Sequence, residues 1–279
     1  MAGHSILLLH AHLPYVRHPD YEAFLEERWL FEAISETYLP LLRMMQRLDD
    51  DQVPFRIALS ISPTLTAMLR DPLLVERYLK HLNRELERTA NTPYAPVAEL
   101  YAARIEQDTH DMEARFAGDL AKTLDYYAKK GYVELLATSA THTFLPNYRN
   151  WPEIVAAQVG LGIESHLRTF GTAPKGFWLP ECGYYEGLEK ILKNAGIEYF
   201  VAAAHGVLLG NPVPNSGVYA PVATRNSVTL LPRDVFTAHW VWSSEAGYPA
   251  DPSYRDFYRD IGYDLPFEYL KPYLPDAPS

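Results

Sequence analysis

One stretch, residues 177–185, constrains the fold of this chain more than any other. Its sequence, Phe-Trp-Leu-Pro-Glu-Cys-Gly-Tyr-Tyr, begins as an apolar run and meets its first charged group at Glu181. Residues 187–196 follow with the pattern of a helix. A strand, a carboxylate at its carboxyl end and then a helix is the arrangement in which parallel α/β proteins present catalytic groups. An ordinary strand-to-loop junction with a solvated glutamate has the same local pattern, because a single carboxylate carries little weight before its geometry is known.

Segments with the pattern of strands alternate with helical segments along most of the chain. Residues 27–48 carry apolar side chains at helical spacing, and we expect Pro40 to kink this helix or to start a new one. Residues 151–170 are amphipathic and end at Gly171, a helix-stop signal. The other expected strands are residues 5–10, 55–60, 131–138, 198–203 and 227–232. This alternation predicts an α/β fold, and 279 residues suit one large domain over residues 1–279.

The stretch between the second and third strands is unusually long. Ser62 followed by Pro63 predicts a helix start after the second strand. From residue 71 to about residue 130 the sequence is helical and strongly charged, and the only clear interruption is Tyr94-Ala-Pro. A simple crossover between parallel strands is far shorter. We therefore predict a helical insertion at about residues 71–130, packed beside the sheet.

Composition limits the partners and the compartment. The formal charge of −10 argues against binding to a nucleic-acid backbone, which needs clustered lysine and arginine. The single cysteine, Cys182, excludes an internal disulfide and suits a reducing cytoplasm. No segment has the length and apolarity of a membrane span or of a signal peptide. We expect a soluble, cytoplasmic protein without nucleic-acid or membrane partners.

Histidines follow two of the expected strands. The His10-x-His12 pair places both rings on one face of an extended strand, a spacing that is compatible with a metal site. No third ligand lies nearby in the sequence, and we favour a structural role for His12 with its hydrogen bonds satisfied. His142 follows the third strand, where a structural role and a site role are equally open.

Five motifs, taken in chain order, resemble those of glycoside hydrolase family 57 in the form carried by its 1,4-α-glucan branching enzymes. Residues 178–184, Trp-Leu-Pro-Glu-Cys-Gly-Tyr, are similar to the nucleophile motif of that family. The other motifs are residues 10–16, 60–65, 138–142 and 241–249. The resemblance covers nearly the whole chain. It implies a parallel (β/α)7-type incomplete TIM barrel, a retaining mechanism on α-1,4-glucans, and neither a catalytic metal nor a cofactor.

The resemblance also implies roles for individual residues. Glu181 matches the catalytic nucleophile, and the expected product is an α-1,6 branch. An imidazole can donate to or accept from a sugar hydroxyl, and flat indole rings stack on sugar faces. For Trp29, anchoring in the core is an equally open reading. The residues that we expect to bind substrate are His10, His142, Trp29, Trp178 and Trp242.

The second carboxyl group of a retaining site does not have an obvious source in this sequence. Retaining glycosidases need two carboxyl groups about 5–5.5 Å apart. The family's acid/base is an aspartate in a later motif, Asp-x-Glu-Leu-Phe-Gly-His-Trp-Trp, which does not occur here. The carboxylates that remain as substitutes are Asp234, Glu245 and Asp251. The chain also has Ala203 where the family often has an aspartate two residues before His205.

These departures imply a truncated amino-terminal portion of a branching enzyme, or a natural short relative. An incomplete barrel exposes a sheet edge, and pairing with a second copy in a homodimer would cover it. Three alternatives stay open. They are a non-catalytic α-glucan-binding relative, a family-57 α-amylase or 4-α-glucanotransferase, and a metal-dependent deacetylase or mannosidase of a related barrel. The Glu-Cys-Gly-Tyr continuation after the nucleophile favours branching.

Overall fold

The computed structural model describes residues 3–90, 95–251, 253–254 and 261–271. The chain forms two compact units, Met1–Pro232 and Arg233–Ser279. Among the described helices, none is both long and apolar enough to cross a bilayer. Tyr94, where the predicted interruption begins, lies outside the described residues.

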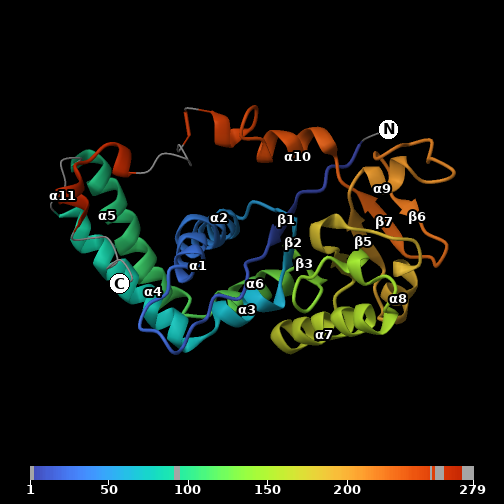
Figure 1. The fold of residues 1–279 in the computed structure, drawn as a ribbon, viewed down its shortest axis with the longest axis horizontal. Coiled ribbons are helices and arrows are strands. Elements are labelled where there is room, and N and C mark those ends of the chain that lie inside the picture. The colour runs from blue at the N-terminus through green and yellow to red at the C-terminus, as the bar shows by residue number, and fades with distance from the viewer. Residues whose placement is uncertain (1–2, 91–94, 252, 255–260, 272–279) are drawn as a thin grey trace. The chain divides into compact units, whose positions relative to one another are not determined.

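A single sheet organises the first unit (Figure 1). Within the described residues it has seven strands in the order β1-β2-β3-β4-β5-β7-β6. Strands β1 to β5 and β7 are parallel to their neighbours, and β6 pairs antiparallel with β7. The strands are β1 (Leu8–Ala11), β2 (Ile57–Ile61), β3 (Val133–Thr138), β4 (Gly176–Trp178), β5 (Tyr199–Ala202), β6 (Val222–Ala223) and β7 (Thr229–Pro232). The predicted α/β class with a mostly parallel sheet is confirmed. The short strand β6 lies outside the stretches that the sequence predicts to be strands.

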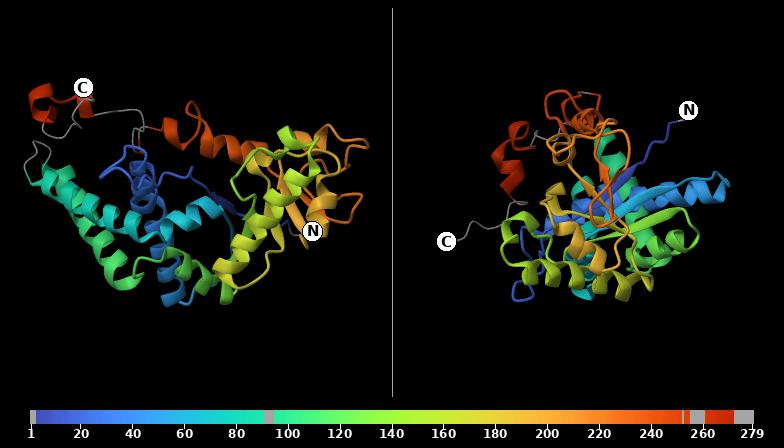
Figure 2. Two further views of the ribbon diagram at one scale, coloured as in Figure 1. Left: turned by 60° about the horizontal axis from the view of Figure 1, so that its bottom comes forward. Right: turned by 90° about the vertical axis from the view of Figure 1, so that its right-hand side faces the viewer.

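Helices follow most of the parallel strands. Figures 1 and 2 show α4 and α5 at one end of the first unit and α7 and α8 at the other. The helical elements of this unit are α1 (Glu27–Ala33), η1 (Ile34–Tyr38), α2 (Leu39–Asp50), α3 (Pro63–Leu69), α4 (Pro72–Thr89), α5 (Ala95–His110), η2 (Asp111–Arg115), α6 (Leu120–Lys129), η3 (Leu145–Tyr148), α7 (Pro152–Phe170), η4 (Pro180–Cys182), α8 (Leu188–Asn194) and α9 (His205–Leu208). The stretch predicted as a helical insertion contains α4, α5, η2 and α6.

The helix predicted over residues 27–48 contains a widened turn rather than a sharp kink. The π-turn η1 separates α1 from α2, and Pro40 falls in the first turn of α2. A proline inside a helix cannot donate to the carbonyl four residues earlier. The π-turn lets the chain continue in helical form past this missing hydrogen bond.

Two start and stop signals read from the sequence are confirmed. The Ser62 hydroxyl accepts a hydrogen bond from the Leu65 amide at 3.3 Å, so Ser62 caps α3 with Pro63 at its first position. Gly171 ends α7 in the left-handed conformation, with φ of 70°.

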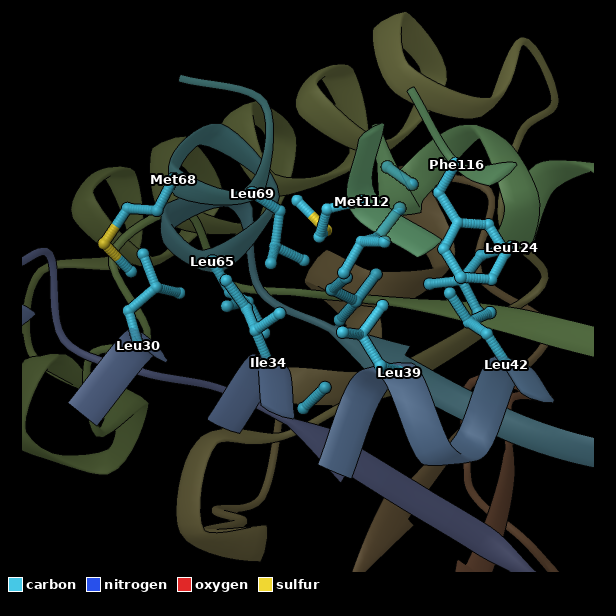
Figure 3. Close-up of a cluster of buried hydrophobic side chains, with 14 of the residues drawn as sticks. Leu30, Ile34, Leu39, Leu42, Leu65, Met68, Leu69, Met112, Phe116 and Leu124 are labelled. Carbon is cyan, nitrogen blue, oxygen red and sulfur yellow. The ribbon is translucent and has the colours of Figure 1, made fainter. Parts of the chain in front are cut away.

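One face of the sheet packs against helices. Leu59, Ile61 and Leu135 belong to the larger hydrophobic cluster, which includes buried residues of α1 to α6. Figure 3 shows how side chains from α1, η1 and α2 meet those of α3, η2 and α6 in this cluster. A second cluster joins Phe177 and Phe200 to α7 and α8. Burial of these apolar faces is the main force that fixes the sheet register.

The opposite face of the sheet carries a smaller cluster, made of strand residues together with Cys182. It includes Leu136, Trp178 and Val201, with Leu8 and Leu231 packed against it. Gly176 lies on this face, because a Cβ atom there would come within 2.3 Å of the Tyr199 ring. Side chains alternate between the two faces of a strand. Residues at the carboxyl ends of the strands that share the orientation of this cluster therefore extend the same surface.

The second unit consists of short elements. It contains α10 (Val235–Trp242), η5 (Tyr248–Ala250), η6 (Ile261–Tyr263) and α11 (Phe267–Leu270). Asp234 caps α10, because its carboxylate accepts from the Thr237 amide at 3.0 Å and from the Thr237 hydroxyl at 2.8 Å. None of the side chains of α10 is buried.

Candidate active site

The register of the sheet brings polar and aromatic side chains into one row at the carboxyl ends of the strands. His10 on β1 pairs with Ser60 on β2, and Thr138 on β3 pairs with Trp178 on β4. Ser60 pairs with Leu136, two residues before Thr138, so all four side chains point to the same face. Four adjacent strands therefore contribute to a single surface.

Three imidazoles and one indole stack along this surface. The Trp178 ring lies 4.4 Å from the His10 ring, centroid to centroid, at an interplanar angle of 13°. The His10 and His142 rings are 4.8 Å apart, and the His142 and His12 rings are 3.8 Å apart. The structure thus brings together three predicted substrate-binding residues, His10, His142 and Trp178.

Hydrogen bonds tie two of these rings to the buried ends of β2 and β3. His10 Nδ1 lies 3.1 Å from Ser60 Oγ, and His142 Nδ1 lies 3.3 Å from Thr138 Oγ1. The remaining ring nitrogens face each other, with 3.2 Å between His10 Nε2 and His142 Nε2. Both hydroxyl residues, Ser60 and Thr138, are fully buried.

Burial favours the neutral form of His142 and His12. It lowers the pKa of His142 to about 4, and the nearby His12 lowers the pKa further in the same direction. The pKa of His12 is also lowered by burial. His12 Nδ1 is buried and has no hydrogen-bond partner among the described residues. The expectation of a His12 with all its hydrogen bonds satisfied is therefore wrong at this nitrogen.

Glu181 follows β4 directly, in the short helical turn η4. Its backbone is left-handed, with φ of 52° and ψ of 23°, and Cys182 also has a positive φ of 54°. Each such residue costs roughly 1–2 kcal/mol relative to a right-handed conformation. The Glu181 side chain is exposed, whereas Pro180 and Cys182 on either side are buried. Strained backbone held in place by buried neighbours is common at functional sites.

The chain after Glu181 is fixed by contacts with two other loops. The Ala203 amide, at the end of β5, donates to the Cys182 carbonyl at 3.3 Å. Gly183 contacts the Phe144 ring so closely that a Cβ atom would come within 2.3 Å of it. The loops after β3, β4 and β5 are therefore packed together around the glutamate.

A second glutamate, Glu189, holds the segment that follows. It is buried at the start of α8 and accepts hydrogen bonds from the Tyr184 hydroxyl at 2.8 Å and the Gly187 amide at 2.9 Å. The Asn226 side chain donates to its other oxygen at 3.0 Å. All three donors use the charged carboxylate, so we assign Glu189 a structural role.

The two remaining predicted tryptophans are exposed. Trp29 lies on α1 with 50% of its surface accessible, which excludes anchoring in the core. Trp242 is the last residue of α10 in the second unit and is 77% accessible. Within the described part of the first unit, Trp29 has no ring contact with the row of His10, His12, His142 and Trp178.

The three candidate acid/base carboxylates all belong to the second unit. Asp234 is engaged as the cap of α10, and its hydrogen bonds with the backbone and side chain of Thr237 lower its pKa, which makes it a poor proton donor. Glu245 and Asp251 line a cavity of about 340 Å³ together with Trp240 and Tyr248.

The geometry of the histidines is poorly suited to a metal. Ring nitrogens bind metals through lone pairs in the ring plane, whereas the His12 and His142 rings are stacked with their centroids 3.8 Å apart. No cluster of three or more His, Cys, Asp or Glu side chains in the described part of the chain has the arrangement to hold an ion.

Comparison with known proteins places the chain in a family. The model for glycosyl hydrolase family 57 matches residues 6–273. The chain therefore belongs to glycosyl hydrolase family 57. A 1,4-alpha-glucan branching enzyme from Thermococcus kodakarensis is 34% identical over 93% of this chain, and a probable 1,4-alpha-glucan branching enzyme from Mycobacterium tuberculosis is 30% identical over 98%. These alignments cover 42% and 56% of the two relatives, so the chain spans about half of their length.

Solved structures share the fold. The alpha-amylase AmyC from Thermotoga maritima matches with a TM-score of 0.88 and 40% identity, over 99% of this chain and 54% of that one. A branching enzyme of this family from Pyrococcus horikoshii matches with a TM-score of 0.83 and 29% identity, over 93% of this chain and 51% of that one. The fold expected from the resemblance is confirmed.

Sequence reasoning missed Ser60, Thr138 and Phe144 as parts of the site. Ser60 and Thr138 occur in motifs quoted for the resemblance, but nothing in their local sequence marks them as partners of histidines. Strand register supplies that information, because it aligns Ser60 with His10. Phe144 reaches Gly183, in the loop after β4, through a long-range contact that no local pattern predicts.

Proposed function

We propose that this chain forms the nucleophile-bearing part of an α-1,4-glucan branching enzyme. The observation that carries the proposal is the position of Glu181. It is an exposed carboxylate on strained backbone, at the end of the same strand as Trp178, whose ring stacks on His10. The chain spans about half of its curated relatives, so the activity of the whole enzyme is part of the proposal.

In the proposed reaction, Glu181 attacks C1 of an α-1,4-linked glucose residue. A covalent glucosyl ester forms, and the bond to the leaving oxygen breaks as that oxygen takes a proton from an acid. The C6 hydroxyl of another glucan chain then attacks C1, gives up its proton and releases Glu181. The product is an α-1,6 branch. The row of rings from Trp178 to His12 supports glucan binding, because flat surfaces suit sugar faces and imidazoles bond to hydroxyls.

The proton donor is the part of the reaction that these residues do not supply. Among the candidates, Asp234 is occupied as a helix cap, and Glu245 and Asp251 line a cavity of the second unit. We propose that the donor comes from the portion of the relatives that this chain does not match. General acid–base help contributes about 10²–10⁴-fold in typical enzymes, so the chain alone is expected to be slow on glucans. We further propose that the reaction takes place in the cytoplasm and that the chain pairs as a homodimer.

A second candidate activity is α-1,4-glucan hydrolysis. The observation that favours it is the 40% identity to the alpha-amylase AmyC from Thermotoga maritima, a higher identity than to the branching enzymes compared above. Both activities use the same covalent intermediate and differ in the acceptor, which is water in hydrolysis.

An activated donor tests the nucleophile without requiring the acid. Fluoride leaves without protonation, so a 5-fluoro-α-glucosyl fluoride should trap the ester on Glu181 even in a chain without its acid. We expect the mass of the peptide containing Glu181 to increase by one fluoroglucosyl group. Glu181→Gln should show no increase, and Glu198→Gln, an exposed glutamate paired with Lys175 at 3.6 Å, should label as the unmodified chain does. Absence of labelling in the unmodified chain would overturn the assignment of Glu181.

Amylose separates the two activities. Proton NMR after incubation should show new α-1,6 signals if the chain branches, and new reducing ends without α-1,6 signals if it hydrolyses. Either product must disappear in Glu181→Gln. Labelling at Glu181 without either product would fit a nucleophile half that lacks its acid.

A further inference from the structure

We propose that Ser60 and Thr138 are positioning residues that hold His10 and His142 in opposite tautomers. The inference concerns hydrogen positions in the row, and its role in catalysis rests on the proposed function. It begins with the unbroken chain of hydrogen bonds from Ser60 Oγ through His10 and His142 to Thr138 Oγ1, at 3.1, 3.2 and 3.3 Å. The residues at the two ends of this hydrogen-bond chain, Ser60 and Thr138, are fully buried, so water does not compete for their hydroxyls.

The contact between the two Nε2 atoms restricts the hydrogens. A neutral imidazole has one N–H donor and one acceptor nitrogen. At 3.2 Å, one Nε2 must carry the hydrogen and the other must accept it. If both Nε2 atoms carried a hydrogen, two donors would face each other. If neither did, two lone pairs would face each other. One ring is therefore the ε tautomer and the other is the δ tautomer.

This rule allows two directions of donation along the hydrogen bonds that connect Ser60 to Thr138. In the first, Ser60 donates to His10, His10 donates to His142, and His142 donates to Thr138. In the second, every donor and acceptor is reversed. A hydroxyl can act as donor or acceptor, so serine and threonine satisfy both directions. The low pKa of His142 agrees with a neutral His142 ring in either case.

The direction matters for a bound sugar. A glucose hydroxyl both donates and accepts, so it can replace the direct contact between the two Nε2 atoms and bridge the rings. The direction of donation along these hydrogen bonds then decides which ring donates to the hydroxyl and which accepts from it. Ser60 and Thr138 would act on substrate through the histidines without touching it.

Two substitutions should push the tautomers in opposite directions. Thr138→Val has almost the same shape but offers no acceptor to His142 Nδ1. A buried N–H without an acceptor is rarer in proteins than a lone pair without a donor. His142 should therefore become the ε tautomer and His10 the δ tautomer. Ser60→Ala removes the partner of His10 Nδ1, so His10 should become the ε tautomer and His142 the δ tautomer.

Long-range ¹H–¹⁵N spectra of protein labelled at histidine nitrogens measure these tautomers directly and need no substrate. In the unmodified chain, the ε fractions of His10 and His142 should add up to one. Thr138→Ser and Ser60→Thr keep the hydroxyls and should keep the unmodified pattern. The proposal would be overturned by ε fractions in the unmodified protein that do not add up to one, or by a shift in the same direction in Thr138→Val and Ser60→Ala.

The unmodified spectrum decides the point even if a variant fails to fold. With α-maltosyl fluoride as donor, Thr138→Val should change kcat/KM by about tenfold, which corresponds to about one lost hydrogen bond, and Thr138→Ser should restore it. Loss of turnover in every form, with complementary tautomers intact, would count against the proposed function alone. Turnover with tautomers that are not complementary would count against the tautomer proposal alone.

Discussion

At the scale of single residues, Glu181 places a carboxylate on strained, left-handed backbone. The left-handed conformation suits glycine, and a β-carbon there has an energetic cost. A carboxylate in this position indicates that stability has been given up for the placement of the side chain.

A comparison of two truncations measures this strain. Glu181→Gly and Glu181→Ala both remove the carboxylate, but only glycine accepts the φ of 52° without cost. We expect Glu181→Gly to be more stable than Glu181→Ala by about 1 kcal/mol in urea unfolding. At Glu198, which does not have a positive φ, the order should reverse, because glycine gains more entropy on unfolding. Equal stabilities at residue 181 would show that the backbone relaxes in solution.

A buried histidine outside the site gives the fold a pH dependence. Burial lowers the pKa of His166 from its ordinary value of 6.5 to about 4. Between these pH values the unfolded chain binds a proton that the folded chain does not, so the free energy of unfolding decreases as the pH falls from 6.5 towards 4. His166→Leu should reduce the slope of the free energy of unfolding against pH by about 1.4 kcal/mol per pH unit in this window.

The contact partner of His166 provides the control. The Phe170 ring lies 4.9 Å from the His166 ring. Phe170→Leu should lower stability by a similar amount at every pH and leave the slope unchanged. An unchanged slope in His166→Leu would mean that the imidazole titrates normally in the folded state.

At the scale of elements, the position of α7 is set by one close approach to β3. A Cβ atom on Gly162 would come within 2.0 Å of the Thr138 carbonyl oxygen, whereas a Cβ atom on Gly160 would have no neighbour within 4 Å. The two glycines are two residues apart in the same helix. They form a matched pair in which only one position touches the sheet.

The pair should respond in opposite ways to alanine. Gly162→Ala must push α7 away from the strand that ends at Thr138, and we expect a loss of roughly 1–3 kcal/mol or more. Gly160→Ala should gain about 0.5–1 kcal/mol, because alanine favours the helix. Urea unfolding of both variants checks the prediction, and a neutral Gly162→Ala would show that α7 shifts without cost.

Most elements of the first unit could be predicted from the sequence, because apolar periodicity and capping residues are local signals. Strands β3, β5 and β7 lie within the predicted stretches, β1, β2 and β4 each extend one residue beyond theirs, and Ser62 and Gly171 act as predicted. The π-turn η1 could not be predicted, because the sequence around Pro40 is equally compatible with a kink or a new helix. The strand β6 has two residues and depends on its pairing with β7.

At the scale of the whole molecule, a buried cluster of ion pairs connects α2 to α5 and η2, which belong to the predicted helical insertion. Arg43 on α2 donates to Asp108 on α5 at 2.6 Å and to Asp111 on η2 at 2.5 Å. Both carboxylates are almost fully buried. Burial raises the pKa of Asp108, although Arg43 opposes this effect.

Removing the arginine should leave the buried Asp108 without its cation and Asp111 with Arg115, which lies 3.1 Å away. We expect Arg43→Met to lower the free energy of unfolding by about 3–5 kcal/mol. Arg168→Met breaks an ion pair with Glu164 on the surface of α7, where Arg168 is 76% exposed, and should cost at most about 1 kcal/mol. Chemical denaturation of both variants makes the comparison. Similar losses would indicate that the Arg43 cluster is worth no more than a surface pair.

The candidate site was predictable to the extent that its residues carry recognisable motifs. His10, His142 and Trp178 come together as the resemblance implies, and Glu181 follows the strand that carries Trp178. The hydroxyl partners Ser60 and Thr138 could not be predicted, because they depend on which residues of neighbouring strands are aligned. The roles of Glu181 and of the five residues expected to bind substrate remain predictions.

The alignment of Ser60 with His10 and of Thr138 with Trp178 has a consequence for how such a protein can change during evolution. The gain or loss of one residue within β2 or β3 would turn the hydroxyl towards the helices and disconnect a histidine. The segments between strands are free of this restriction. Lineages descended from such a chain should therefore differ in length in their helices and loops, while each strand that carries a site residue keeps its residue count.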